Sequence, residues 1–161
     1  MTPELIEDAS FLLGELRARK LMLATAESCT GGLISATLTE VPGSSDVVER
    51  GFVTYSNDAK MEMLGVAEAL IEEHGAVSEE VACMMAQGAV AHSSADIAVS
   101  VTGIAGPGGG TADKPVGLVH FAVARRGKSV TPARRTFGDI GRGSIREKSV
   151  KEAFDLVRSI L

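Results

Sequence analysis

A serine in a glycine-punctuated turn is the first feature of this sequence that could do chemistry. Ser28 lies in the segment AESCTGG, after a short apolar run typical of a buried strand. Ligand sites of open α/β sheets gather at the carboxyl ends of strands, so this position favours a nucleophile. Free N–H groups at Thr30, Gly31 and Gly32, close to a helix start, could stabilise an oxyanion or bind a phosphate. The alternative is an ordinary turn in which Ser28 only caps the next helix.

A serine hydroxyl needs a base, and the segment YSNDAK at residues 55–60 offers a lysine. We expect Tyr55 to end the second strand and Lys60 to lie on the short helix that follows. A serine–lysine pair, relayed by Tyr55, can activate a hydroxyl without histidine. Because the pKa of a free lysine is about 10.4, Lys60 must be partly desolvated to act as a base near neutral pH. The alternative is a solvated helix lysine.

A glycine-rich stretch, TGIAGPGGGTADKPVG at residues 102–117, directly follows another buried strand. Its backbone N–H groups could form an anion-binding nest or hold a ribose and a ring. It lacks the G-K-[ST] ending of a Walker A loop, and a strand follows it where a dinucleotide fingerprint needs a helix. The alternative is a flexible surface loop without a ligand.

Two arginines open the last predicted helix. Arg142 and Arg146 are four residues apart and therefore share one helix face. Positive charge at a helix N-terminus opposes the helix dipole, so two arginines there are unfavourably placed. An anion bound between the two side chains would explain this placement, because the planar guanidinium of arginine binds phosphate well. The alternatives are solvated arginines, or salt bridges to Asp139 and Glu147.

The elements that must position these segments are predicted to be helices and strands that largely alternate along the chain. We expect helices near 3–16, 33–38, 57–64, 78–90 and 143–161, and strands at 21–26, 51–55, 97–102, 117–124 and 130–137, the last two as an antiparallel hairpin. Thr2, Asn57 and Ser78 are the expected N-caps. The order predicts an α/β fold, a three-layer α/β/α sandwich with a mixed, mostly parallel sheet. The length of 161 residues predicts a single domain over 1–161.

The composition of the chain limits which partners and which cellular compartment we expect. The formal net charge of -5 disfavours nucleic acid as the main partner. No apolar run is long enough for a membrane helix, and the acidic N-terminus is unlike a secretory signal, so we expect a cytoplasmic protein with no membrane partner. The two cysteines, Cys29 and Cys83, support neither a disulfide framework nor a zinc site. The histidines, His74, His92 and His120, have no metal-ligand spacing, so no metal is expected.

The four segments, in this order and with GAVSEEVA at residues 75–82 between them, resemble the signature of the CinA C-terminal domain family along nearly the whole chain. The resemblance implies a nicotinamide-nucleotide amidohydrolase, which converts nicotinamide mononucleotide and water into nicotinate mononucleotide and ammonia in pyridine nucleotide salvage. It also implies a three-layer sandwich that forms homo-oligomers, with no metal or cofactor. The chain resembles the stand-alone version of the domain.

Carried over to this sequence, the family pattern makes Ser28 the nucleophile and Lys60 its base, with Tyr55 assisting. The expected substrate contacts are Thr30, Gly31, Gly32, Thr102, Gly103, Gly106, Gly108, Arg142 and Arg146, with Arg142 on the phosphate. One departure affects Asp139, because Ile140 and Gly141 separate it from Arg142 where the family has a Gly-Asp-Arg run.

Two other readings of the sequence remain open. Cys29 could be the nucleophile, since a thiol at a helix N-terminus has a lowered pKa. Alternatively, the protein is a non-catalytic nucleotide-binding or scaffold protein of the competence and DNA-damage response. The sequence leaves the oligomer size and the range of accepted amides undetermined.

Overall fold

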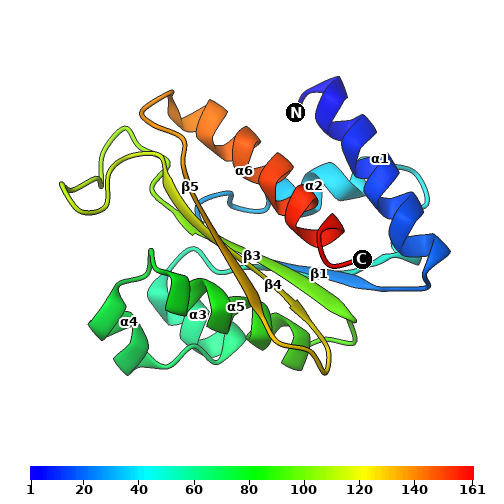
Figure 1. Cartoon of the computed structure of the whole chain (residues 1–161), viewed down its shortest axis with the longest axis horizontal. Helices are drawn as coiled ribbons and strands as arrows, with labels where there is room; N and C mark the ends of the chain where they lie inside the picture. The colour runs from blue at the N-terminus through cyan, green and yellow to red at the C-terminus, as the bar shows by residue number, and fades with distance from the viewer.

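A five-stranded mixed sheet forms the middle layer of the computed structural model, which covers residues 1–161 (Figure 1). The strands are β1 (Leu23–Glu27), β2 (Val48–Val53), β3 (Ile97–Gly103), β4 (Leu118–Arg125) and β5 (Thr131–Thr136), in the spatial order β2-β1-β3-β4-β5. β1 is parallel to β2 and to β3, whereas β4 is antiparallel to both β3 and β5. Only β4 therefore runs against the other four strands.

Helices cover both faces of this sheet (Figure 1). On one face lie α1 (Pro3–Ala18), α2 (Leu33–Thr39) and α6 (Arg142–Arg158), and on the other lie α3 (Asn57–Leu64), α4 (Glu68–His74) and α5 (Glu79–Ala91). A short 3-10 turn, η1 (Ser44–Asp46), precedes β2. The predicted three-layer α/β/α sandwich with a mostly parallel sheet is thus confirmed. None of the helices has the length and apolar character that crossing a membrane requires.

The two faces of the sheet carry side chains of different size. On β3, Val99 and Val101 face the larger core cluster under α1, α2 and α6, whereas Ala98 faces α5. Ala122 on β4 also faces α5, so this layer packs closely onto small side chains. Strict alternation along buried strands produces this division, because successive side chains point to opposite faces. The core therefore needs few aromatic residues.

Most predicted elements are confirmed, but the segment before the lysine-bearing helix differs. β2 ends at Val53, so Tyr55 lies two residues beyond the strand instead of ending it. The N-cap of α3 is Ser56, whose Oγ accepts from the Ala59 N–H at 3.0 Å, and not Asn57. The cause is that β2 is an edge strand with exposed residues, so apolar alternation does not mark its limits.

The helix α4 has no counterpart among the predicted elements. It has seven residues, only Ile71 is buried, and no side chain caps its N-terminus, so neither periodicity nor a cap marks it. The other two predicted caps are confirmed: the Oγ1 of Thr2 accepts from the Leu5 N–H and the Oγ of Ser78 from the Val81 N–H, both at 3.3 Å.

Candidate active site

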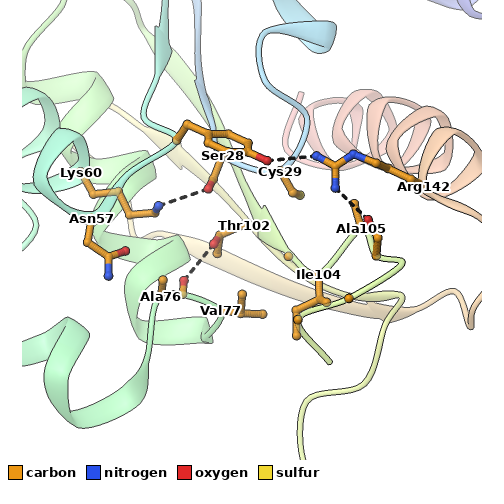
Figure 2. A pocket seen from close by; sticks show the side chains of 15 residues that line it. Ser28, Cys29, Asn57, Lys60, Ala76, Val77, Thr102, Ile104, Ala105 and Arg142 are labelled. Atoms are coloured by element: carbon orange, nitrogen blue, oxygen red, sulfur yellow. Dashed lines mark hydrogen bonds between the residues drawn. The ribbon is translucent and has the colours of Figure 1, made fainter. Parts of the chain in front are cut away.

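A cleft of about 280 Å³ opens at the carboxyl ends of β1 and β3, where Figure 2 shows the side chains that line it. Eight residues proposed from the sequence line this cleft: Ser28, Tyr55, Lys60, Thr102, Gly103, Gly106, Gly108 and Arg142. Four others do not: Thr30, Gly31, Gly32 and Arg146. Further lining comes from Cys29, Asn57, Ala76, Val77, Ile104, Ala105 and Gly109.

Ser28 is the first residue after β1, at the start of a tight turn. Its N–H donates to the Val101 carbonyl at 2.9 Å, which extends the pairing of β1 with β3, and its own carbonyl accepts from the Gly31 N–H at 2.9 Å. Gly31 and Gly32 have φ of +58° and +96°, a backbone conformation that favours glycine. The two glycines thus serve the turn itself, which presents the Ser28 hydroxyl to the cleft.

The side chain of Lys60 points toward the Ser28 hydroxyl (Figure 2). Its Nζ lies 3.1 Å from Ser28 Oγ and donates to the Thr54 carbonyl at 3.1 Å. The side chain is only 1% exposed and has no carboxylate partner. Burial lowers the pKa of Lys60, because desolvation disfavours the ammonium form. The partial desolvation expected of Lys60 is therefore present.

The N-terminus of α2 is occupied by Glu27, a residue of the AESCTGG segment that was not among the residues proposed from the sequence. Glu27 is fully buried, and its carboxylate accepts from the Ile34 N–H at 2.8 Å and from the Ser35 N–H and hydroxyl, both at 3.0 Å. These contacts satisfy two N–H groups that a helix start leaves without partners. The sequence signal for this contact is an acidic residue at the end of the strand that precedes the helix. The helix end is therefore closed to a substrate anion.

The opposite wall is formed by Thr102 and the glycine-rich loop. Thr102 Oγ1 donates to the Ala76 carbonyl at 2.8 Å, which joins β3 to the segment before α5 (Figure 2). A Cβ at Gly103 would lie 2.9 Å from the Leu118 carbonyl oxygen, so only glycine allows this approach. The N–H groups of Ala105, Gly106, Gly108 and Gly109 donate to no protein acceptor. The loop thus lines the cleft with residues whose backbone donors have no protein partner, and the predicted role in binding an anion stays a prediction.

Arg142 and Tyr55 meet at the mouth of the cleft. Arg142 Nη1 donates to the Gly106 carbonyl at 2.9 Å, and Nη2 donates to the Tyr55 hydroxyl at 3.0 Å. Tyr55 is 62% exposed and forms no hydrogen bond with Ser28 or Lys60, so the structure contains no relay through this hydroxyl. Arg142 forms no ion pair with Asp139, which leaves its charge available to an anion.

Arg146 points away from the cleft, behind the serine turn. Its Nη2 donates to the Thr30 carbonyl at 2.8 Å, and its Nε is buried without a partner. Thr30 is fully buried, and its Oγ1 has no partner either. Arg142 and Arg146 therefore do not flank one shared site, and the second arginine contacts the backbone of the turn.

The thiol of Cys29 lines the cleft beside Ser28, yet it is poorly suited to be the nucleophile. Burial, opposed by its own backbone N–H, raises the pKa of the Cys29 thiol to about 11. The reactive form of cysteine is the thiolate, which is scarce at neutral pH for such a pKa. The lowered pKa expected of a thiol at a helix N-terminus is absent, because burial of the thiol dominates and the nearby Glu27 carboxylate raises the pKa further.

Comparison with known proteins identifies the family of this chain. Residues 7–161 match the family model of the CinA C-terminal domain. A CinA-like protein of Mycobacterium marinum is 56% identical over 140 residues, which cover 86% of this chain and 32% of the relative. The chain spans about a third of the length of the curated relatives it matches.

Solved structures of similar proteins have the same fold. The crystal structure of the competence/damage inducible protein CihA from Agrobacterium tumefaciens is 50% identical and superposes with a TM-score of 0.96, covering 99% of this chain and 96% of that one. A CinA superfamily protein from Escherichia coli is 33% identical with a TM-score of 0.92, covering 100% of this chain and 94% of that one.

Proposed function

The chain belongs to the CinA C-terminal domain family, and from this premise and the Ser28–Lys60 pair we propose that it deamidates nicotinamide mononucleotide by serine catalysis. The observation that carries the proposal is the 3.1 Å separation of Ser28 Oγ and Lys60 Nζ in a cleft where Lys60 is almost fully buried. The motifs that resemble the nicotinamide-nucleotide amidohydrolases support the choice of substrate.

Acylation begins with proton transfer from the Ser28 hydroxyl to the neutral amine of Lys60. The Oγ attacks the carboxamide carbon and forms a tetrahedral intermediate with a negatively charged oxygen. Lys60, now an ammonium, gives its proton to the amide nitrogen. The carbon–nitrogen bond then breaks, ammonia leaves, and nicotinate mononucleotide remains attached to Ser28 as an ester.

In deacylation, Lys60 acts first as a base toward water and then as an acid toward the Ser28 oxygen. Lys60 takes a proton from a water molecule, whose oxygen attacks the ester carbon, and then returns that proton to Ser28 Oγ as the ester bond breaks. The sum is carboxamide plus water to carboxylic acid plus ammonia. The Thr54 carbonyl accepts one N–H of Lys60 and orients the amine between these transfers.

The phosphate and the ribose are assigned to the other side of the cleft. Arg142 is the proposed phosphate ligand because its guanidinium lines the cleft without a carboxylate partner. The free N–H groups at Gly106, Gly108 and Gly109 are proposed to bind ribose or phosphate oxygens. The proposed chemistry combines nucleophilic catalysis by Ser28 with acid–base catalysis by Lys60. We further propose that the protein acts in the cytoplasm and as a homo-oligomer.

The direct test is ammonia release from nicotinamide mononucleotide by purified protein. Ser28→Ala and Lys60→Met are each expected to lower kcat by about 1,000-fold or more, in line with removal of a nucleophile or its base. Ser28→Ala should retain substrate affinity within a few fold, measured by calorimetry. Hydroxylamine added during turnover should trap the acyl group as a hydroxamate, and the hydroxamate should be absent with Ser28→Ala.

Two outcomes would redirect the assignment. Loss of turnover in Cys29→Ala with full turnover in Ser28→Ala would make the thiol the nucleophile. Nucleotide binding without ammonia release by the wild-type protein would leave the non-catalytic sensing or scaffold role, which the names of the relatives allow.

A further inference from the structure

The serine turn contains two peptide groups that are hydrogen-bonded in series. The Thr30 carbonyl accepts from Arg146 Nη2 at 2.8 Å. The N–H of the same peptide group belongs to Gly31, and it donates to the Ser28 carbonyl at 2.9 Å. The N–H on the far side of that second peptide group belongs to Cys29, and it has no acceptor on another residue, since its one interaction is with its own thiol. All donors in this series point the same way, from the guanidinium toward Cys29.

The free end of the series lies beside the nucleophile. Since the C=O and N–H of a trans peptide group point in opposite directions, a Ser28 carbonyl held toward Gly31 directs the Cys29 N–H out of the turn. Cys29 itself lines the cleft (Figure 2). In the α/β-hydrolases, the N–H of the residue after the nucleophilic serine is an oxyanion donor. The helix α2 cannot supply this donor from Ile34 or Ser35, because Glu27 binds both N–H groups.

The charge of Arg146 has no partner other than this turn. Arg158, on the same helix, is neutralised by Asp8, Glu15 and Asp155, whereas Arg146 forms no ion pair at all. Its side chain is half-buried, and the Thr30 carbonyl is its only hydrogen-bond acceptor. Hydrogen bonds in a chain polarise one another, and a cation at the donor end strengthens every bond after it.

We infer that Arg146 is a positioning residue, which orients and polarises the peptide groups of the serine turn so that the Cys29 N–H stabilises the oxyanion of the proposed reaction. The inference rests on the proposed function for the identity of the reacting group. It also revises the expected role of Arg146, which acts on the turn from behind and does not bind the phosphate beside Arg142.

Steady-state kinetics separates this role from substrate binding. The oxyanion develops in the transition state and is absent from the bound substrate, so Arg146→Met should lower kcat by about tenfold and leave KM within about twofold. Arg142→Met, the matched control on the same helix, should instead raise KM for the nucleotide. Arg146→Lys, which retains one donor and the charge, should recover part of kcat. A rise in KM with unchanged kcat in Arg146→Met would overturn the inference.

A thiocarboxamide analogue of nicotinamide mononucleotide gives a sharper readout. Sulfur accepts weaker hydrogen bonds than oxygen, so the wild-type ratio of kcat for the amide over the thioamide measures the oxyanion donor. This ratio should fall in Arg146→Met and stay unchanged in Arg142→Met. Damage to the fold alone would lower both rates together, and an unchanged ratio in Arg146→Met would contradict the inference.

Backbone NMR tests the same hydrogen-bond series without any turnover. In ¹⁵N-labelled protein, the amide protons of Gly31 and Cys29 should move upfield in Arg146→Met, because they lose polarisation, and should keep their wild-type positions in Arg142→Met. Unchanged shifts in Arg146→Met would overturn the inference even if deamidation is confirmed. If the wild-type protein releases no ammonia, the proposed function fails, and these shifts still decide whether Arg146 polarises the turn.

Discussion

Arg142 and Tyr55 are joined across the mouth of the cleft, where the arginine Nη2 donates to the tyrosine hydroxyl at 3.0 Å. The two residues come from the start of α6 and the segment after β2, which are 87 positions apart in the chain. This contact holds the guanidinium over the cleft. The tyrosine hydroxyl thus contacts Arg142 and forms no hydrogen bond with the serine–lysine pair.

The first prediction concerns this contact. Tyr55→Phe should raise KM for the nucleotide by about fivefold, because a hydrogen bond of about 1 kcal/mol that orients Arg142 is lost. The kcat should change by less than about twofold. Initial rates of ammonia release over a range of substrate concentrations would measure both constants. A large fall in kcat with unchanged KM would restore the catalytic role that the sequence suggested for Tyr55.

The second prediction is the pH dependence of the reaction. Only the neutral amine of Lys60 can accept the Ser28 proton, so kcat/KM should rise with pH through the pKa of Lys60 and then level off. Burial lowers that pKa from the value of about 10.4 for a free lysine, so the midpoint of the rise should lie below this pH. The Tyr55→Phe variant is the control and should show the same midpoint. A midpoint at or above the pKa of a free lysine would refute the assignment of Lys60 as base.

The third prediction follows from the same buried amine but concerns stability. Because the folded-state pKa of Lys60 lies below the unfolded one, the unfolded chain binds more protons between the two values. The free energy of unfolding should therefore increase as pH rises through this window. Lys60→Met removes the effect and should be more stable than the wild type near pH 7. Urea denaturation at pH 7 and pH 10 would test this, since the advantage of the variant should shrink at the higher pH.

The fourth prediction concerns the packing that positions the helix of Lys60. A Cβ at Gly88 on α5 would collide with the carbonyl oxygen of Leu64, the last residue of α3. Gly88→Ala should lower the free energy of unfolding by about 1–3 kcal/mol through overpacking. It should also lower kcat, because α3 carries Lys60.

Gly14→Ala provides the matched control for that variant. Gly14 lies on α1, and a Cβ there would contact nothing within 4 Å. The same substitution should therefore raise the free energy of unfolding by about 0.5–1 kcal/mol, through the higher helix propensity of alanine. Thermal denaturation of both variants would measure the two changes. Equal effects at the two sites would contradict the close contact between α5 and α3.

The fold could be predicted from the sequence wherever burial imposes a period on it. Helix α1 repeats its apolar residues on one face, and β3 is buried along most of its length, so both were found close to their actual limits. Helix α4 was missed because its seven residues bury only Ile71. The limits of β2 shifted because this edge strand pairs on one side only and exposes several of its residues.

The site could be predicted only where its residues follow strand ends. Placement after β1 and after β2 was enough to expect Ser28 near Lys60, because these two strands are parallel and end at the same edge. The contacts of a long side chain could not be predicted from its position relative to a strand end or on a helix face. Arg142 and Arg146 share a helix face, yet one reaches the cleft and the other reaches Thr30, 116 residues earlier in the chain. Such contacts depend on how α6 packs against the serine turn.

The cleft draws its main groups from four separate segments, which carry Ser28, Lys60, Thr102 and Arg142. No fragment of the chain short of the start of α6 contains all four. A nascent or partly unfolded chain therefore lacks the complete centre, and its appearance requires docking of α3 and α6 onto opposite faces of the sheet. Turnover thus reports on the native tertiary structure as a whole, and recovery of activity after dilution from denaturant would time the last docking step of refolding.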